Sequence, residues 1–92
     1  METKITFEEY LRKENLSENT ITSYLWTVNY FNANYDVVSK ENLLAYKGYL
    51  MEFFKPKTVN LRIQAINKYL EYLEEQQLQL KAVKVQQKNF LE

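Results

Sequence analysis

KPKTVNLRIQAINKYLEYL (residues 55–73) has the hydrophobic spacing of an amphipathic helix and contains the only proline of the chain. Apolar residues recur every three or four positions, which is the pattern of one buried helical face. Pro56 suits the first helical position, because a proline lacks the N–H that would have no helical partner there. The stretch therefore predicts a helix over residues 56–77. Its expected inward side chains are Val59, Ile63, Ile66, Leu70 and Leu73.

The beginning of this helix is basic. Lys55 and Lys57 flank the proline, and no acidic residue occurs between Phe53 and Leu70. A helix N-terminus already carries about half a positive charge, so each lysine there costs roughly a few tenths of a kcal/mol. A bound phosphate would reverse the sign of this term, because it can accept hydrogen bonds from backbone N–H groups and cations together. The lysines therefore suggest an anionic partner, and a solvated polar face is the alternative.

Three more helices are predicted upstream by their N-terminal signals. Thr6 and Glu9 have the spacing of a capping box, and Ser17 and Ser39 are further N-cap candidates. The expected spans are residues 7–14, 18–34 and 40–54. Their expected inward side chains are Tyr10, Leu11, Ile21, Tyr24, Leu25, Val28, Phe31, Leu43, Tyr46, Leu50 and Phe53. Since the chain has few helix breakers and short connections, we predict an all-α fold, a compact four-helix domain.

The domain organisation follows from length and from the last fifteen positions. Ninety-two residues are enough for one hydrophobic core but not for two. After residue 77 the helical pattern weakens to a brief alternation that has no partner strand in the chain. We expect a helical domain over residues 1–77 and an extended linker over residues 78–92 that leads to a domain absent here. The final Leu91-Glu92 can be native or a vector remnant.

Composition argues against an independent enzyme. Histidine and cysteine are absent, which removes the usual general base, a common metal ligand and the thiolate nucleophile. Glu74 and Glu75 are adjacent and would diverge around a helix, and most tyrosines lie on apolar stripes. No glycine-rich phosphate loop occurs, since Gly48 is the only glycine. We therefore expect no catalytic residue, no metal site and no cofactor in this chain.

The same features predict a cytoplasmic location. No apolar run approaches the roughly 20 residues that cross a bilayer, and the N-terminus lacks a secretion signal. The absence of cysteine fits a reducing compartment. Twelve basic and twelve acidic residues cancel, so net charge alone does not indicate a polyanionic partner.

Polar residues occur on two of the predicted helices in a pattern that favours nucleic-acid contact. No charged residue lies between Asn19 and Tyr35, and short hydrogen-bonding side chains line the expected exposed side of that helix. Such a face can approach a polyanion without repulsion. On the basic helix, amides such as Gln64 can address base edges or phosphates, and Arg62 can pair with a phosphate or a carboxylate.

LSENTITSYLWTVNYF (residues 16–31) resembles a segment of the tyrosine recombinases, the phage-integrase family. That segment usually reads Ser–x–x–Thr–x–x–x–Tyr, followed by an apolar residue and Phe, and it is matched by Ser17, Thr20, Tyr24 and Phe31. Residues 55–73 are similar to the fourth helix of the family's N-terminal domain, and VVSKENLLAYKGYL (residues 37–50) resembles the intervening helix. The matches in the fourth helix are Thr58, Val59, Asn60, Arg62, Ile63, Ala65, Ile66, Tyr69, Tyr72 and Leu73. The likeness covers about residues 5–77.

The resemblance implies the core-binding (SAM-like) domain, a non-catalytic module that clamps duplex DNA at the recombination core site. In the family the catalytic residues belong to a following domain, and the second and fourth helices of the core-binding domain face the duplex. The implied partners are double-stranded DNA and, through the whole protein, other recombinase protomers. The candidate DNA contacts are Ser17, Asn19, Thr20, Ser23, Lys55, Lys57, Thr58, Asn60, Arg62 and Gln64. Members often carry more basic residues on these helices, and residues 18–34 have none.

A helical protein-interaction module is the alternative interpretation. The uncharged helix contains Trp26 and Tyr30, and Tyr35 follows it; these aromatics are not all needed for the predicted core. An exposed aromatic patch would mark a surface for a protein partner.

Overall fold

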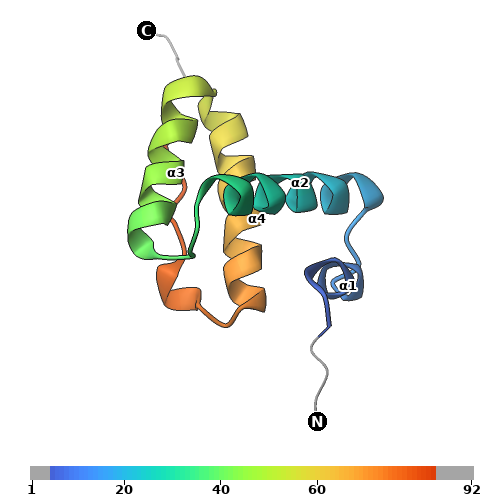
Figure 1. Ribbon diagram of the computed structural model, residues 1–92. Coiled ribbons are helices and arrows are strands. Elements are labelled where there is room, and N and C mark those ends of the chain that lie inside the picture. Colours follow the sequence, from blue (N-terminus) through green and yellow to red (C-terminus); the bar gives the residue numbers. More distant parts are fainter. Residues whose placement is uncertain (1–4, 85–92) are drawn as a thin grey trace, which may run out of the picture.

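The computed structural model describes residues 5–84, in which helices are the only regular secondary structure. The elements are α1 (Phe7–Lys13), α2 (Glu18–Asn34), α3 (Lys40–Phe53), α4 (Pro56–Tyr72) and the short 3₁₀ turn η1 (Gln76–Leu78). α2 crosses α4, α3 lies alongside α4, and α1 packs against both α2 and α4 (Figure 1). The predicted all-α fold is confirmed, and the first three helices end within one residue of their predicted ends.

The predicted N-caps of α1, α2 and α3 are present. The Thr6 hydroxyl accepts a hydrogen bond from the Glu9 N–H at 3.1 Å, and the Glu9 carboxylate accepts one from the Thr6 N–H at 3.0 Å. Ser17 and Ser39 likewise cap α2 and α3 with their side chains. Lys55 occupies the N-cap of α4 and makes no such bond. The start of α4 therefore has no side-chain acceptor among the described residues.

α4 ends at Tyr72 and not at residue 77 as predicted, because the chain turns there without a recognisable sequence signal. Glu74 adopts a left-handed conformation with a φ of 62°. Its N–H bonds to the Glu71 carbonyl at 3.0 Å, and the Glu75 N–H bonds to the Leu70 carbonyl at 2.8 Å. This pair of bonds is a Schellman motif, which stops a helix by satisfying its last carbonyls. Glycine is the usual residue at the left-handed position, so a glutamate there gave no sequence signal.

The core consists of two hydrophobic clusters. One cluster joins α2, α3 and α4 around Phe31, Tyr46 and Ile66, and the other joins α1 to α2 around Leu11 and Ile21. Most predicted inward residues are buried in them, although some are only half-buried. The half-buried ones are Tyr10, Tyr24, Leu25 and Leu73. The prediction for Phe53 was wrong, because it lies in the last turn of α3 with its side chain 65% exposed, its ring resting on Tyr49.

Residues 79–84, here called the strap, are packed against the helices, whereas the sequence predicted an extended linker over residues 78–92 that leads away from the domain. Leu80 is only 7% exposed and belongs to the cluster formed by α2, α3 and α4. Leu78 and Val83 pack against the same cluster. The packed domain therefore extends past the predicted boundary at residue 77. The rest of the predicted linker, residues 85–92, lies outside the described residues.

Two asparagines of α4 hold the strap. The Asn67 amide donates to the Leu80 carbonyl at 2.9 Å and accepts from the Leu80 N–H at 2.8 Å. Asn60 does the same with Val83, at 3.0 and 2.8 Å. Seven helical residues rise about 10.5 Å, and three extended residues span about 10 Å, so the two amides match two positions of one extended chain. Side-chain amides thus replace the partner strand that the sequence lacks.

Replacing Leu80 with alanine is expected to lower the free energy of unfolding by about 2–4 kcal/mol, because it leaves a cavity in the core. Asn67→Ala should lower it by about 1–3 kcal/mol, because the buried strap backbone loses both hydrogen bonds. Lys81→Ala alters an exposed strap side chain and should stay within about 0.5 kcal/mol of the wild type. Urea denaturation measures all three. A Leu80→Ala effect no larger than that of Lys81→Ala would show that the strap is a free linker.

Candidate functional site

The helices α2 and α4 form a shallow groove beside their crossing, with a volume of about 220 Å³. It is lined by Asn19, Thr20, Ser23, Tyr24, Leu61 and Gln64. Four of these six residues were predicted as DNA contacts from two segments that are distant in the sequence. The groove lining contains no charged side chain. The fold therefore brings together the polar faces of the two helices that the sequence had indicated separately.

The polar side chains of the groove differ in how free they are. Thr20 is engaged in the α2 cap, where its N–H donates to the Ser17 hydroxyl at 3.2 Å and its own hydroxyl accepts from the Ser17 hydroxyl at 3.0 Å. The side chains of Asn19, Ser23 and Gln64 are exposed and make no hydrogen bond to any other described residue. These three groups can bond a ligand without breaking a contact within the protein.

An exposed stripe of α4 continues from the groove to the basic helix start. Lys57, Leu61, Gln64 and Lys68 succeed one another at intervals of four, three and four residues, which places them on one side of a helix. Lys57 and Lys55 are exposed, and neither joins an ion pair with a described residue. Thr58 is half-buried beside them. Lys57 thus provides an unpaired cation at the end of the stripe that lies nearest the start of α4.

The ion pairs of the described chain gather near α1, away from the start of α4. Arg12 pairs with Glu8 and Glu18, and Lys68 pairs with Glu14 and Glu71. Because α1 packs against the later part of α4, acidic side chains and their cationic partners cancel one another there. The net charge of zero therefore conceals two different regions. Charges are paired near α1, whereas Lys55 and Lys57 are unpaired at the start of α4.

Arg62 has a role that the sequence did not reveal. Its Nη1 donates to the Thr27 hydroxyl at 3.1 Å, and the centre of the guanidinium lies 4.6 Å from the centroid of the Trp26 ring. Thr27 is fully buried and donates its own proton to the Ser23 carbonyl at 2.9 Å. Arg62 therefore joins α4 to α2 at their crossing, by a hydrogen bond to a buried hydroxyl and a cation–π contact. The predicted phosphate contact would have to use its remaining donors.

Asn60 is positioned for the strap and not for the groove. Both polar atoms of its amide bond to the Val83 backbone. A DNA contact by Asn60 would require those bonds to be shared or broken. Asn60 is therefore not among the free polar side chains of α4. The sequence could not show this, because the partner backbone lies 23 positions away in the chain.

Leu61 is a groove residue that the sequence analysis did not select. Its side chain is 57% exposed between Lys57 and Gln64 on the stripe. An apolar residue on a predicted polar face carries no signal by itself, since single exposed leucines are common. Its spacing from Lys57 and Gln64 is the pattern that would have identified it.

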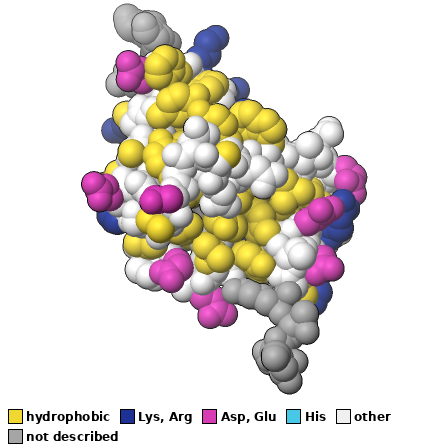
Figure 2. Space-filling model, in the orientation of Figure 1, with side chains coloured by type: hydrophobic (Ala, Val, Ile, Leu, Met, Phe, Trp, Pro, Cys, Tyr) yellow, Lys and Arg dark blue, Asp and Glu magenta, His cyan; other side chains and the backbone are white. Residues whose placement is uncertain are grey.

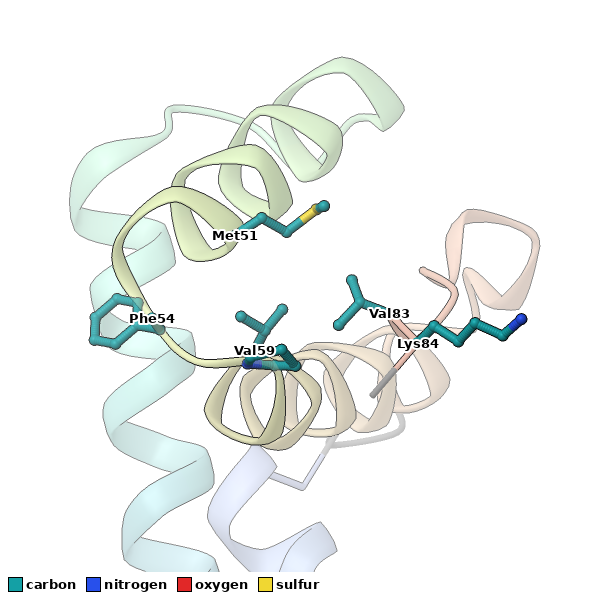
Figure 3. A pocket seen from close by; sticks show the side chains of 6 residues that line it. Met51, Phe54, Val59, Val83 and Lys84 are labelled. Atoms are coloured by element: carbon teal, nitrogen blue, oxygen red, sulfur yellow. The ribbon is translucent and has the colours of Figure 1, made fainter. Parts of the chain in front are cut away.

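A second, apolar hollow lies between the end of α3, the start of α4 and the strap, with a volume of about 170 Å³ (Figure 3). Its lining consists of Met51, Phe54, Pro56, Val59, Val83 and Lys84. The Lys84 side chain extends away from the hollow into the surroundings (Figure 3). The strap thereby places another lysine near Pro56, at the basic start of α4.

The carboxylate of Glu71, whose pKa is lowered, has a structural role. The Tyr10 hydroxyl donates to Glu71 at 2.6 Å, and this bond ties α1 to α4. The bond raises the pKa of Tyr10 to about 12 and lowers the pKa of Glu71 below its ordinary value. Lys68 also contacts the Glu71 carboxylate, at 3.3 Å. This arrangement stabilises the charged carboxylate and the neutral phenol, which is unsuited to proton transfer near neutral pH.

Replacing Arg62 with methionine should lower the free energy of unfolding by about 1–2 kcal/mol, because the buried Thr27 hydroxyl loses its donor and the Trp26 ring loses its cation. Lys57→Met makes the same chemical change at an exposed position and should be nearly neutral. Thermal or urea unfolding of the two variants measures the difference. Equal stability of both variants would mean that the contact at the crossing contributes nothing.

The Tyr10–Glu71 bond also predicts a pH dependence. Because the folded-state pKa of Glu71 is lowered, its stabilisation is complete above the ordinary value of 4.5 and is lost as the pH falls through the folded pKa. The pKa of Tyr10 is raised, so its stabilisation is complete below pH 10 and is lost as the pH rises towards 12.

Tyr10→Phe should therefore flatten both limbs of the curve of unfolding free energy against pH, measured by urea titrations at successive pH values. Tyr24→Phe removes a hydroxyl that does not contact Glu71, and this control should keep the wild-type acid limb. A Tyr10→Phe curve with the same slopes as the wild type would contradict the assignment.

Within residues 5–84, no helix combines the length and apolar character needed to cross a membrane. The same residues contain no cluster of three or more histidine, cysteine, aspartate or glutamate side chains that could hold a metal ion. No protein-family model, curated protein or solved structure matches the chain. The likeness to tyrosine recombinases therefore rests on the sequence segments 16–31, 37–50 and 55–73 alone.

Proposed function

We propose that this chain is a non-catalytic DNA-binding domain of a site-specific tyrosine recombinase and that it holds duplex DNA against α2 and α4. The observation that carries the proposal is the coincidence of two features on one side of α4. The unpaired Lys57 and the exposed Gln64 share a stripe of this helix, and that stripe borders a groove whose α2 side presents the free side chains of Asn19 and Ser23.

The two kinds of side chain suit the two parts of a duplex. Lys55 and Lys57 can neutralise backbone phosphates, which supply most of the affinity of a DNA-binding surface and position the protein. Asn19, Ser23 and Gln64 carry donors and acceptors that can bond base edges in the major groove. The absence of acidic side chains from the groove lining removes the main source of repulsion.

The strap supports the clamp that the resemblance implies. Since Val83 is tied to Asn60 and Lys84 lies near Pro56, the described chain ends beside the basic start of α4. A connector to a catalytic domain in the parent protein would then leave residue 84 beside the basic start of α4. Such a connector would let two domains enclose one duplex and would bring other recombinase protomers to the same DNA.

The proposal predicts salt-sensitive binding to duplex DNA, measured by fluorescence anisotropy at low ionic strength. Lys57→Gln should reduce the slope of log affinity against log salt by about 0.9, the contribution of one neutralised phosphate. Lys40→Gln removes an exposed lysine from the first turn of α3, roughly 20 Å from the start of α4, and should leave the slope unchanged.

Chemical-shift mapping on the same complex locates the surface. The expected perturbations lie at Asn19, Ser23, Gln64 and the first turn of α4. The DNA-binding proposal fails if no duplex binds with salt sensitivity, if the two lysine variants behave alike, or if the perturbations are confined to α1 and α3.

A protein-interaction surface is a second candidate, favoured by an exposed aromatic run. Trp26 stacks on Tyr30, Tyr30 stacks on Tyr49, and Phe53 follows, with ring centroids 5.6, 5.8 and 5.2 Å apart. Trp26 and Phe53 are 52% and 65% exposed. Figure 2 shows hydrophobic side chains across much of one face, with charged side chains mainly towards its outline. Self-association that persists at high salt and is lost in Phe53→Ala would favour this function.

A further inference from the structure

Leu61 and Gln64 form a neighbouring pair on the exposed stripe of α4. They are three residues apart, so they lie on the same side of the helix about one turn from each other. Both line the groove, and Leu61 is its most exposed large apolar side chain, at 57%. The pair therefore offers a methyl-bearing surface and an amide side by side, with Lys57 one turn before them.

The spacing of this pair suits the major-groove edge of one base pair. Side chains three residues apart on a helix have their Cβ atoms about 5–6 Å apart, so both can reach into a major groove about 12 Å wide and meet the two bases of one pair. With Lys57 on a phosphate, the next turns of the stripe would pass over base edges in the major groove. Leu61 would meet the bases, because it is the one aliphatic hydrocarbon side chain in the groove lining and is 57% exposed.

The chemical groups of Leu61 and Gln64 favour one kind of base pair. A glutamine amide can bond both N6 and N7 of adenine, and an aliphatic side chain can pack on the 5-methyl group of thymine. A G·C pair offers no methyl group and presents two acceptors on guanine, which an uncharged amide matches less well than an arginine does. We infer, on the basis of the proposed DNA-binding function, that Leu61 and Gln64 read an A·T base pair in the major groove, Leu61 contacting the thymine methyl and Gln64 the adenine.

The inference can be tested with the full chain and a pool of random duplexes about 20 base pairs long, which is roughly two turns of B-DNA. Selection and sequencing of the bound duplexes should reveal at least one A·T position for the wild type. That preference should be lost with Leu61→Ala or Gln64→Ala. Leu44→Ala changes another exposed leucine, on α3 and 50% exposed, and should keep the wild-type preference.

Base analogues in a selected duplex separate the two contacts. Replacing thymine with uracil removes only the methyl group and should weaken wild-type binding about fourfold, the effect of one buried methyl. Leu61→Ala should bind the thymine and uracil duplexes equally. Replacing adenine with 7-deazaadenine removes the N7 acceptor and should weaken the wild type while leaving Gln64→Ala unaffected.

The outcomes distinguish this inference from the proposed function. Salt-sensitive binding without any selected A·T position, or a uracil penalty that persists in Leu61→Ala, would overturn the assignment of Leu61 and leave DNA binding intact. Failure to bind any duplex at low salt would overturn both. Because Leu61 and Gln64 are exposed, their alanine variants are expected to keep the wild-type fold, which circular dichroism verifies.

Discussion

The crossing of α2 over α4 is the constraint on which the rest of the molecule depends. At this point Thr27 and Ala65 are buried, and their small side chains let the two helices approach. The Thr27 hydroxyl donates to the Ser23 carbonyl and accepts from Arg62, and loss of a partner by a buried polar group costs about 1–3 kcal/mol. Arg62 also covers the Trp26 ring with the same guanidinium. Arg62 therefore ties α4 to α2 by a hydrogen bond and a cation–π contact beside an otherwise apolar core.

This crossing determines which surfaces remain for binding. Since Arg62 and its neighbours on α4 face α2, and Asn60 and Asn67 hold the strap, only the stripe between those two sides stays exposed. Polar residues of α4 thus divide into those that hold the protein together and those that are free to meet a ligand. The division is a consequence of helix geometry, because neighbouring stripes of one helix must face different partners.

The charged side chains also divide into those that are paired within the protein and those that are not. The carboxylates near α1 are held by Arg12 and Lys68, and Tyr10 adds a hydrogen bond to Glu71. Lys55 and Lys57 have no such partners among the described residues. A protein with a net charge of zero can therefore leave Lys55 and Lys57 unpaired for a polyanion, while four of its carboxylates, Glu8, Glu14, Glu18 and Glu71, are paired near α1. The electrostatic term of the proposed DNA binding depends on this separation.

Local signals in the sequence were sufficient for the helices themselves. Capping residues such as Thr6 and Ser17, the proline at the start of α4 and the spacing of apolar residues all act within a few positions, so they can be read directly. The roles of Asn60 and Arg62 could not be read in this way. Their partners, Val83 and Thr27, lie 23 and 35 positions away, and only the packed chain brings them into contact.

The sequence by itself determined the all-α class, the four helices and the two polar faces, because these depend on short-range periodicity and capping. Only the tertiary structure decided that Leu80 belongs to the core and that Asn60 and Arg62 are engaged within the protein. It also placed Leu61 beside Gln64 in a common groove with Asn19 and Ser23. The physical reason is that a polar side chain bonds to whichever group the fold brings nearest. When that group belongs to a distant segment, the local sequence does not identify it.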